Sequence, residues 1–447
     1  MNAPSKYLLA TFGCQMNEYD SNLVGSMLEK RGMALTRNPD EADLFVVNTC
    51  SIRGGAEDKA YARIAALRHH KRQRSGVRIA VIGCMAQNHG EKIPTALEHV
   101  DYVVGPDGYG ELEGMIFDNG PADGPVVWTE QNDFENYTGL TARLDGSVTA
   151  HITIMRGCNK RCTYCIVPNV RGVERSRDAA EIVAEARQAV AQGVREICLL
   201  GQTVNSYRTD GLEGKVSFAD LLRRLQDVDG LRRIRFTSPH PRHFDTDTIR
   251  AIAECDKVCN HVHMPLQSGS NDLLKKMRRQ YTRERYLEIV DELRATIPDV
   301  AITTDIIAGF VGETEADFED TLSLMEAVRF DHAFMFSYSP REGTPAFSEV
   351  ETLTAADKQA RLERVIELQM RHSEQRLDAL VGRDEEILLE YPSSRDANEW
   401  IGRTQGFKKV TVPVAPGIGK GDFVIARVRE RRGLVLRGEL VGTSSLP

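Results

Sequence analysis

Three closely spaced cysteines are the strongest chemical signal in the sequence: Cys158, Cys162 and Cys165, here called the central trio. Three thiolates this close together can wrap one cubic iron–sulfur cluster and leave its fourth iron without a protein ligand. Ferredoxin runs and zinc pairs differ, because they supply four ligands and close the site. An open iron can be chelated by the amine and carboxylate of S-adenosylmethionine, whose sulfonium then accepts an electron. The spacing therefore predicts a cluster that cleaves this cofactor to a radical.

A second set of cysteines, here called the N-terminal trio, is spread over the first part of the chain: Cys14, Cys50 and Cys84. Each follows a predicted strand, and each separation matches one strand–helix–strand crossover. Ligands of open α/β sheets bind at the carboxyl ends of the strands, and Gly13 and Gly83 permit close backbone approach to a bulky group. We therefore expect a second cluster with an open iron here, with ordinary packing of small residues as the alternative.

The composition is that of an ordinary globular protein, with 447 residues, 41% hydrophobic and 27% charged. No apolar run is long enough to span a membrane, and the N-terminus lacks the pattern of a signal peptide, so a cytoplasmic location is expected. Nine cysteines are an odd number for a disulfide framework. The three outside the trios are expected in the core, where free cysteine usually packs: Cys198, Cys255 and Cys259.

An α/β fold of three parts is predicted. Residues 5–120 show short apolar strands alternating with helices, which indicates a parallel sheet covered on both faces. The stretch 106–138 is rich in Gly, Pro, Asp and Asn and is expected to have little regular structure, with a linker at 121–143. Residues 144–377 contain six strand–helix units, too few for a closed eight-unit barrel, so a partial, open (β/α)6 barrel is expected. One of its helices is expected to break near Tyr281.

Residues 378–444 change character, since Val, Ile and Leu alternate with polar residues and helical periodicity disappears. About five strands in a small β-barrel are expected. Between residues 395 and 440 there are ten basic and five acidic residues, in a chain of net charge −8. A small basic barrel is a common way to hold RNA by its phosphates, a solvated charged face being the alternative. The best contact candidates are Lys408, Lys409, Arg427, Arg429, Arg431 and Arg432.

Polar residues near the carboxyl ends of the predicted barrel strands are candidates for cofactor binding, because active sites of such barrels form there. Gln202, Gln267 and Asp305 could hold the amino, carboxylate or ribose groups of a nucleoside cofactor. Tyr164, inside the loop of the central trio, could stack on adenine, and a structural aromatic is the equal alternative.

The motifs around both trios resemble one family, the methylthiotransferases of the radical S-adenosylmethionine superfamily. The resemblance covers nearly the whole chain, from an N-terminal cluster domain through a radical core to a TRAM-like RNA-binding barrel. The segments that carry it are Thr11-Phe12-Gly13-Cys14-Gln15-Met16-Asn17, Asn48-Thr49-Cys50, Ile82-Gly83-Cys84, Gly157 to Pro168, Arg171-Gly172 and Arg175-Ser176-Arg177. The branch that acts on dimethylallyladenosine in tRNA is the most similar, through Phe12 to Ser21, Phe236 to Pro241 and Tyr338-Ser339-Pro340-Arg341.

The resemblance implies transfer of a methylthio group to carbon 2 of N6-dimethylallyladenosine at position 37 of tRNA, next to the anticodon. It implies two 4Fe-4S clusters: the N-terminal trio would hold the auxiliary cluster that carries the sulfur, and the central trio the cluster that reduces S-adenosylmethionine. One S-adenosylmethionine would give the methyl group and a second the radical. The implied partners are the tRNA anticodon stem-loop and a low-potential electron donor such as flavodoxin or ferredoxin, with no membrane.

Three residues depart from the usual family pattern. Arg156 stands where an acidic residue is common, Thr203 where Asn is usual, and Val311 where Pro is usual. None of these changes removes a cysteine of either trio.

Three alternatives remain beside this reading. Two are sister activities, methylthiolation of threonylcarbamoyladenosine in tRNA and of an aspartate in a ribosomal protein; the basic tail speaks against the basic protein substrate. The third is a non-catalytic iron–sulfur RNA-binding module. Open three-cysteine sites speak against it, because electron carriers normally close their clusters with four ligands.

Overall fold

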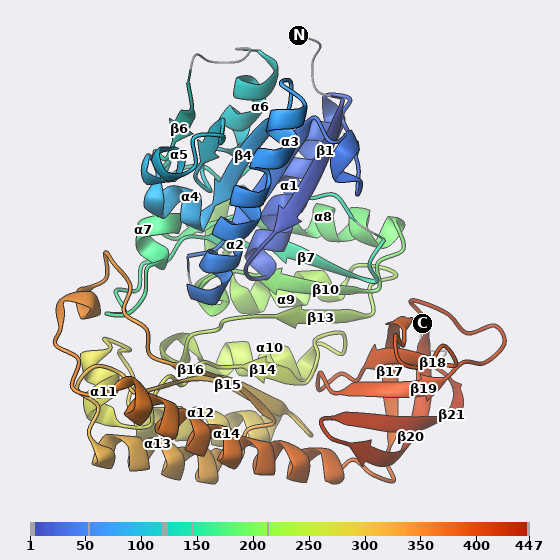
Figure 1. Cartoon of the computed structure of the whole chain (residues 1–447). Coiled ribbons are helices and arrows are strands. Elements are labelled where there is room, and N and C mark those ends of the chain that lie inside the picture. The colour runs from blue at the N-terminus through green and yellow to red at the C-terminus, as the bar shows by residue number, and fades with distance from the viewer. Residues whose placement is uncertain (1–4, 52–53, 119–123, 145, 212–213, 445–447) are drawn as a thin grey trace.

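The computed structural model describes residues 5–51, 54–118, 124–144, 146–211 and 214–444. It has three parts in chain order: an N-terminal α/β unit, a central open barrel and a small closed β-barrel (Figure 1). In Figure 1 the N-terminal unit (blue) lies above the central barrel (green and yellow), and the C-terminal barrel (red) lies to the side. The predicted fold class is confirmed.

The N-terminal sheet has six parallel strands in the order β2-β1-β3-β4-β5-β6. Strand β3 is buried at every residue, because its run Leu44-Phe45-Val46-Val47 has apolar side chains for both faces. The strand bounds are β1 Lys6–Thr11, β2 Ala34–Leu35, β3 Leu44–Thr49, β4 Arg78–Gly83, β5 Tyr102–Val104 and β6 Val126–Trp128.

Helices cover both faces of this sheet. Helices α1 and α6 pack on the face that carries Leu44 and Val46, whereas α2, α4 and α5 pack on the face of Phe45 and Val47. Helix α3 joins the second face, where His70 stacks on Phe45 with ring centroids 5.1 Å apart. The helix bounds are α1 Gln15–Lys30, α2 Gly54–Ala66, α3 Arg68–Gln73, α4 Cys84–His89, α5 Lys92–Ala96 and α6 Tyr109–Phe117.

The expectation of little regular structure over residues 106–138 was wrong. Helix α6 lies there and buries Leu112 and Met115 against the sheet. Strand β6, inside the predicted 121–143 linker, pairs with β5 and completes the sheet. The stretch is rich in turn-forming residues, so its two short apolar segments, α6 and β6, were not recognised. Packing against the edge of the sheet orders both of them.

The central barrel contains two parallel three-stranded sheets, β7-β10-β13 and β14-β15-β16. The Ile234 N–H donates to the Lys257 carbonyl at 2.7 Å and joins β13 to the chain entering β14. No pairing between β7 and β16 occurs in the described part of the chain, so the barrel is open, as predicted. The strand bounds are β7 Thr149–Thr153, β10 Glu196–Leu200, β13 Arg233–Phe236, β14 His261–His263, β15 Ala301–Ala308 and β16 His332–Ser337.

The predicted helix break near Tyr281 is confirmed. Arg278 and Gln280 adopt left-handed backbone conformations with φ of 57° and 61°. Thr282 then caps the next helix by accepting a hydrogen bond from the Arg285 N–H. The helices are α7 Val167–Arg171, α8 Ala179–Ala191, α9 Phe218–Gln226, α10 Thr246–Glu254, α11 Asn271–Lys276, α12 Arg283–Thr296, α13 Glu315–Val328 and α14 Ala355–Asp378. Short pairs that the sequence analysis did not predict are β8 Met155–Arg156 with β9 Arg175–Ser176, and β11 Arg208–Gly211 with β12 Gly214–Ser217.

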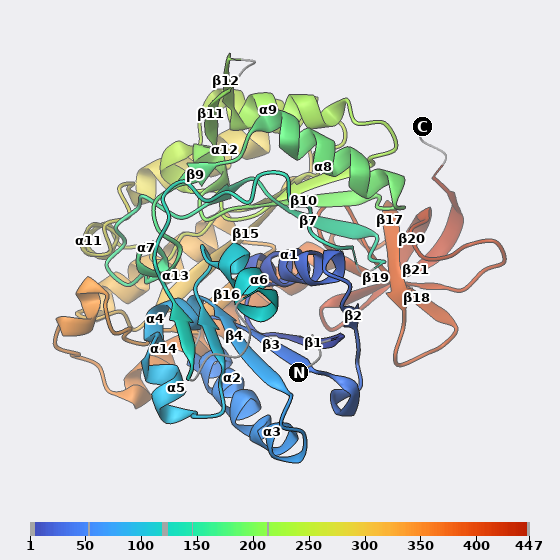
Figure 2. The same cartoon turned by 90° about the horizontal axis from the view of Figure 1, so that it is seen from above.

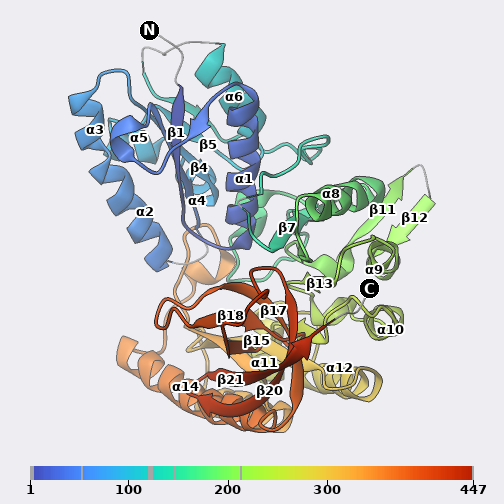
Figure 3. The ribbon, with the colours of Figure 1, turned by 90° about the vertical axis from the view of Figure 1, so that its right-hand side faces the viewer.

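The C-terminal barrel closes in the order β17-β18-β19-β21-β20 around a small core that includes Val410, Val424 and Leu436. Closure pairs every strand edge, which protects so small a sheet. The bounds are β17 Asp384–Pro392, β18 Glu399–Arg403, β19 Lys409–Pro413, β20 Phe423–Arg432 and β21 Val435–Thr443. Figure 3 shows this barrel in front of the central barrel, with α14 running beneath it.

Two buried arginines of β13 attach the C-terminal barrel to the central one. Arg233, 1% exposed, donates to the carbonyls of Arg403 at 2.8 Å and Glu386 at 2.9 Å. Arg235 donates to the carbonyls of Thr404 at 2.8 Å and Gln405 at 2.7 Å. Because these carbonyls are shielded from water, each arginine holds the barrel in one orientation.

None of the described helices has the length and apolar character needed to cross a membrane.

The variant Arg233→Ala is expected to loosen the C-terminal barrel. It removes three hydrogen bonds and leaves a void at a buried interface, a loss on the order of 3 kcal/mol. We expect faster tryptic release of the segment after Arg383 and a lower urea midpoint. Arg187→Ala, at an exposed position of α8, is the control and should leave both unchanged. Equal cleavage rates for the two variants would show that Arg233 does not hold the barrel.

Candidate active site

The central trio lies on the loop between β8 and α7, beside the carboxyl end of β7. Gly157 begins the loop with φ of +70°, and a Cβ atom there would lie 1.8 Å from the Val173 carbonyl oxygen, so only glycine fits. On the other side, the Thr163 N–H donates to the Met277 carbonyl at 3.2 Å. The loop is therefore held from both sides.

Hydrogen-bond donors surround the central thiols. The Arg279 guanidinium donates to Cys162 Sγ at 3.4 Å, and the Lys160 N–H donates to Cys158 Sγ at the same distance. The Thr203 hydroxyl lies 3.7 Å from Cys158 Sγ. N–H groups directed at sulfur favour its anionic form, the form that binds iron. The chemistry around the thiols therefore fits a metal cluster.

The N-terminal trio lies at the carboxyl edge of its sheet. Cys14 caps α1 just after β1, Cys50 follows β3, and Cys84 begins α4 directly after β4. Gly13 has φ of +137°, and a Cβ atom there would lie 2.7 Å from the Cys50 Cβ. Gly83, with φ of +93°, is equally confined. The glycines thus allow the three strand ends to come together.

An asparagine pair fixes these strand ends. The Asn17 side-chain amide donates to Asn48 Oδ1 at 2.9 Å and to the Thr49 carbonyl at 3.0 Å. In return, the Asn48 amide donates to the Asn17 carbonyl at 2.9 Å. Both side chains are fully buried, so the network locks the start of α1 against the end of β3.

Burial disfavours the thiolate form of three of the six cysteines in the absence of iron. It raises the pKa of Cys84 to about 12 and that of Cys165 to about 12, and it raises the pKa of Cys158 as well. Iron binds thiolates, so loading these sites displaces protons from the thiols.

The N-terminal trio packs against the segment that follows the central trio. Cys84 lies in one apolar cluster with Ile166, the residue after Cys165, and with Val170 of α7. The Arg171 Nε–H donates to Cys84 Sγ at 3.3 Å. Figure 2 shows α7 beside α4. Among the described residues, no group of His, Cys, Asp or Glu is arranged to hold a single metal ion; a cubic cluster spaces its ligands further apart.

A cavity of about 980 Å³ leads from the N-terminal trio to the C-terminal barrel. Cys14 and Met16 line one end, and Phe407 and Lys409 line the other. Phe407 stacks on His261 with ring centroids 5.1 Å apart and an interplanar angle of 14°. All three parts of the chain contribute walls, so the cavity exists only in the assembled fold.

The predicted cofactor residues lie at separate places around the barrel end. Tyr164 packs edge-on against Phe310, with ring centroids 6.2 Å apart. Gln267 joins Asp305 through the backbone, its N–H donating to the Asp305 carbonyl at 2.8 Å. The Asp305 carboxylate faces His263 at 3.5 Å and lines the cavity.

Gln202 carries an unmet polar group. Its side-chain oxygen is buried and accepts no hydrogen bond within the described residues. A buried acceptor without a donor is unfavourable by about 1–3 kcal/mol. The position therefore fits an incoming ligand with a donor group. No contact in the described part of the chain joins Gln202 or Tyr164 to the Gln267–Asp305 pair.

Five of the six predicted RNA contacts form ion pairs within the protein. Lys408 reaches Asp331 at 2.5 Å in a half-buried position beside the cavity. Lys409 lines the cavity, and no ion pair to it occurs among the described residues. The other pairs are Arg427–Asp384, Arg429–Glu439, Arg431–Asp378 and Arg432–Glu430. Exposed pairs of this kind are weak, so phosphates can replace their carboxylates; the RNA contacts stay predictions.

Four buried polar residues near the cysteines were not predicted from the sequence to belong to the site: Asp20, Arg171, Arg279 and Asn17. Asp20, Asn17 and Arg171 stood inside motifs around the trios, which was the available signal. Arg279 is far from its cysteine in sequence and gave no such signal.

The three departures from the family pattern are accommodated. Arg156 forms a buried ion pair with Asp20 at 2.8 Å. Thr203 contacts Cys158, as described above, and Val311 is buried in an apolar cluster with Phe310.

Two family profiles match the chain. The profile described as the Radical SAM superfamily matches residues 152–325, and the one described as "Uncharacterized protein family UPF0004" matches residues 6–105. The first implies a 4Fe-4S cluster and S-adenosylmethionine.

Curated relatives match nearly the full length. The tRNA-2-methylthio-N(6)-dimethylallyladenosine synthase of Alkaliphilus oremlandii is 43% identical over 98% of this chain and 93% of its own. The synthase of the same name from Moorella thermoacetica is 42% identical over 99% of both chains.

Solved structures share the fold at low identity. The radical S-adenosylmethionine methyltransferase TsrM of Kitasatospora setae superposes with a TM-score of 0.57 at 15% identity, over 76% of this chain and 77% of that chain. The cobalamin-dependent S-adenosylmethionine radical enzyme OxsB gives a TM-score of 0.52 at 12% identity, over 83% and 56%. These two matches show the fold alone.

Replacing Gly13 by alanine is expected to abolish the cluster predicted at the N-terminal trio. The new methyl group would overlap Cys50 Cβ, and the positive φ adds about 1 kcal/mol of strain. After anaerobic reconstitution, iron and sulfide should fall to about half of the wild-type content.

Gly32→Ala is the matched control, because Gly32 also has positive φ, of +87°, but nothing lies within 4 Å of the new methyl group. It should keep the full iron content. Equal iron in both variants would rule out the close approach at Gly13 as a requirement of the site.

Cys158→Ala is expected to remove the cluster predicted at the central trio. About half of the iron should remain, and cleavage of S-adenosylmethionine to deoxyadenosine should stop, because the open iron is lost. Cys255→Ala, at another buried cysteine, should change neither quantity. Deoxyadenosine formation by Cys158→Ala at the wild-type rate would contradict the assignment of the central trio.

Proposed function

Because the chain belongs to the family of the tRNA-2-methylthio-N(6)-dimethylallyladenosine synthases, we propose that it attaches a methylthio group to carbon 2 of N6-dimethylallyladenosine at position 37 of tRNA. The chain is a tRNA methylthiotransferase with a radical S-adenosylmethionine domain. The packing of Cys84 in one apolar cluster with Ile166, the residue after Cys165, carries the proposal, since it ties the N-terminal trio to the loop of the central trio.

The proposed ligands of the two 4Fe-4S clusters are the two trios. When bound, the clusters supply an electron and a sulfur atom, and two molecules of S-adenosylmethionine supply a methyl group and a deoxyadenosyl radical. Radical chemistry suits the substrate, because an aromatic ring carbon has no acidic proton for base chemistry. The nearness of the two trios supports a reaction in which radical and sulfur meet at one base.

The protein's part in this reaction is binding and orientation. Arg279 donates to Cys162 and keeps the central loop in place. We assign cofactor binding to Gln202. Its buried side-chain oxygen accepts no hydrogen bond from the described residues, so it is suited to an amino or hydroxyl group of the cofactor. Asp305, at the cavity wall, is suited to ribose hydroxyl groups, and Tyr164 and Gln267 complete the proposed set.

The cavity offers the target nucleotide a path to Cys14 of the N-terminal trio. Its outer end, at the C-terminal barrel, carries the positive charge of Lys409, which is suited to the phosphates of RNA. Phe407 also lines this end, with its ring stacked on His261. Its inner end reaches Cys14. A loop base next to the anticodon is single-stranded and can enter such a cavity without disruption of base pairs.

The same proposal divides the chain by task. Residues 5–120 would carry the auxiliary cluster, residues 144–377 the radical core and residues 378–444 the contacts to the anticodon stem-loop. A low-potential donor such as flavodoxin or ferredoxin would deliver the electron, and the reaction would take place in the cytoplasm.

Nucleoside analysis of tRNA tests the substrate. A strain without this chain should lack the methylthio derivative of dimethylallyladenosine and accumulate dimethylallyladenosine itself. The wild-type chain should restore it, and Cys158→Ala should not. Mass spectrometry of digested tRNA measures both nucleosides. If the derivative persists without any second enzyme, or if the threonylcarbamoyladenosine derivative disappears instead, the substrate assignment is wrong.

A further inference from the structure

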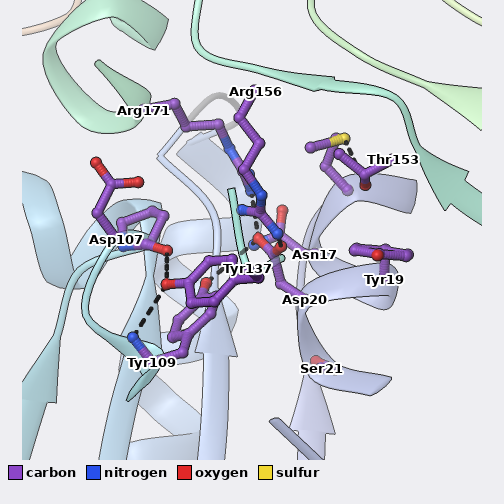
Figure 4. Close-up of polar contacts among 12 residues, drawn as sticks. Asn17, Tyr19, Asp20, Ser21, Asp107, Tyr109, Tyr137, Thr153, Arg156 and Arg171 are labelled. Carbon is purple, nitrogen blue, oxygen red and sulfur yellow. Dashed lines mark hydrogen bonds and ion pairs between the residues drawn. The ribbon is translucent and has the colours of Figure 1, made fainter. Parts of the chain in front are cut away.

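A buried carboxylate joins the N-terminal unit to the loop of the central trio. Asp20, on α1, is fully buried and accepts hydrogen bonds from Arg156 at 2.8 Å and from Arg171 at 2.9 Å. Arg156 ends β8 just before the trio, and Arg171 ends α7 just after it. Figure 4 shows both guanidinium groups converging on Asp20.

The charges of this cluster do not balance. Burial would raise the pKa of Asp20, but the two arginines hold it below its usual value, so the carboxylate is ionised. Tyr109 donates a further hydrogen bond to Asp20 at 3.2 Å, and the Tyr137 ring lies 4.7 Å from the Arg156 guanidinium. Two cations therefore share one carboxylate, and one positive charge remains in a site without water access.

Neighbouring carboxylates do not neutralise this surplus charge. Arg175 forms an ion pair with Asp107 at 2.9 Å, and Arg177 forms one with Glu185 at 2.7 Å. Each of these carboxylates is therefore neutralised by its own arginine. Arg171 points its remaining Nε–H at Cys84 Sγ, 3.3 Å away. The sulfur of Cys84 is thus the group toward which the unbalanced charge is directed.

We propose that Arg171 is a positioning residue of the auxiliary cluster: it donates a hydrogen bond to the sulfur of Cys84 and raises the reduction potential of the cluster held there. The proposal rests on the proposed function, which assigns the N-terminal trio to that cluster. A cation and an N–H donor both stabilise the more negative, reduced form of a cluster, and hydrogen bonds to sulfur are an established control of its potential.

Asp20 aims this donor. The planar guanidinium can bind the carboxylate through Nη2 and the sulfur through Nε at the same time, which an ammonium group cannot do with the same geometry. Arg156 binds the other oxygen of the same carboxylate. The carboxylate therefore connects the N-terminal trio to the loop that carries the central trio, and it holds the two in a fixed relative position.

The test measures potential rather than turnover. In the full-length chain with Cys158, Cys162 and Cys165 replaced by alanine, only the auxiliary cluster can form. Its midpoint potential is determined by anaerobic redox titration followed by electron paramagnetic resonance. Arg171→Gln should shift the potential to more negative values at an unchanged iron content. Arg171→Lys keeps the positive charge but cannot bind the Asp20 carboxylate and the Cys84 sulfur with the same geometry. It should give a smaller shift in the same direction.

Arg279→Gln is the matched control, because Arg279 is a buried arginine whose partner in the wild-type chain is Cys162 of the central trio and not a cysteine of the N-terminal trio. In this background it should leave the auxiliary potential unchanged. An unchanged potential in Arg171→Gln, with full iron content, would overturn the inference. So would equal shifts in Arg171→Gln and Arg279→Gln.

Two further outcomes are decisive. If Arg171→Gln fails to fold, Arg171→Lys takes its place: a negative shift supports the inference, and an unchanged potential overturns it. If the parent variant binds no iron, the cluster assignment of the proposed function fails, and this inference falls with it. A potential shift in this background, together with a wild-type chain that does not methylthiolate tRNA, would instead remove only the substrate assignment.

Discussion

The ion pairs of Asp20 with Arg156 and Arg171 are the interaction on which the rest of the structure depends. A carboxylate and two guanidinium groups without water are stable only in contact, because separation would leave an uncompensated charge in a low-dielectric interior. The N-terminal unit supplies the carboxylate, and the central barrel supplies both guanidinium groups. These hydrogen bonds therefore fix the orientation of the N-terminal unit relative to the central barrel. They also fix the position of the N-terminal trio relative to the loop of the central trio.

The opposite end of the site uses the same principle. Arg233 and Arg235 of β13 satisfy backbone carbonyls of the C-terminal barrel, and Arg235 also binds Glu196 at 2.8 Å. Its guanidinium lies 4.9 Å from the centre of the Phe407 ring, which in turn stacks on His261. Charged groups buried between domains are selective for one arrangement, since each requires its own partner. The cavity keeps its shape for this reason.

The secondary structure of the chain was largely predictable from local patterns. Apolar periodicity marks the strand Ala301–Ala308 and the helix Glu315–Val328 clearly, and Thr314 caps that helix. Helix α6 and strand β6 were missed, since their few apolar residues are ordered only by the sheet edge they complete. The closed C-terminal barrel followed from alternation of apolar and polar residues.

The sequence by itself determined the chemistry: six cysteines in two open sets, and the strand ends that carry the N-terminal one. Residue type and spacing along the chain are local properties, and they suffice for that inference. Only the tertiary structure decided that Cys84 meets Ile166, that Arg171 and Arg279 point at sulfur, and that Asp20 lies between two arginines. These contacts join residues more than eighty positions apart, and no local pattern encodes which distant charges will share one buried site.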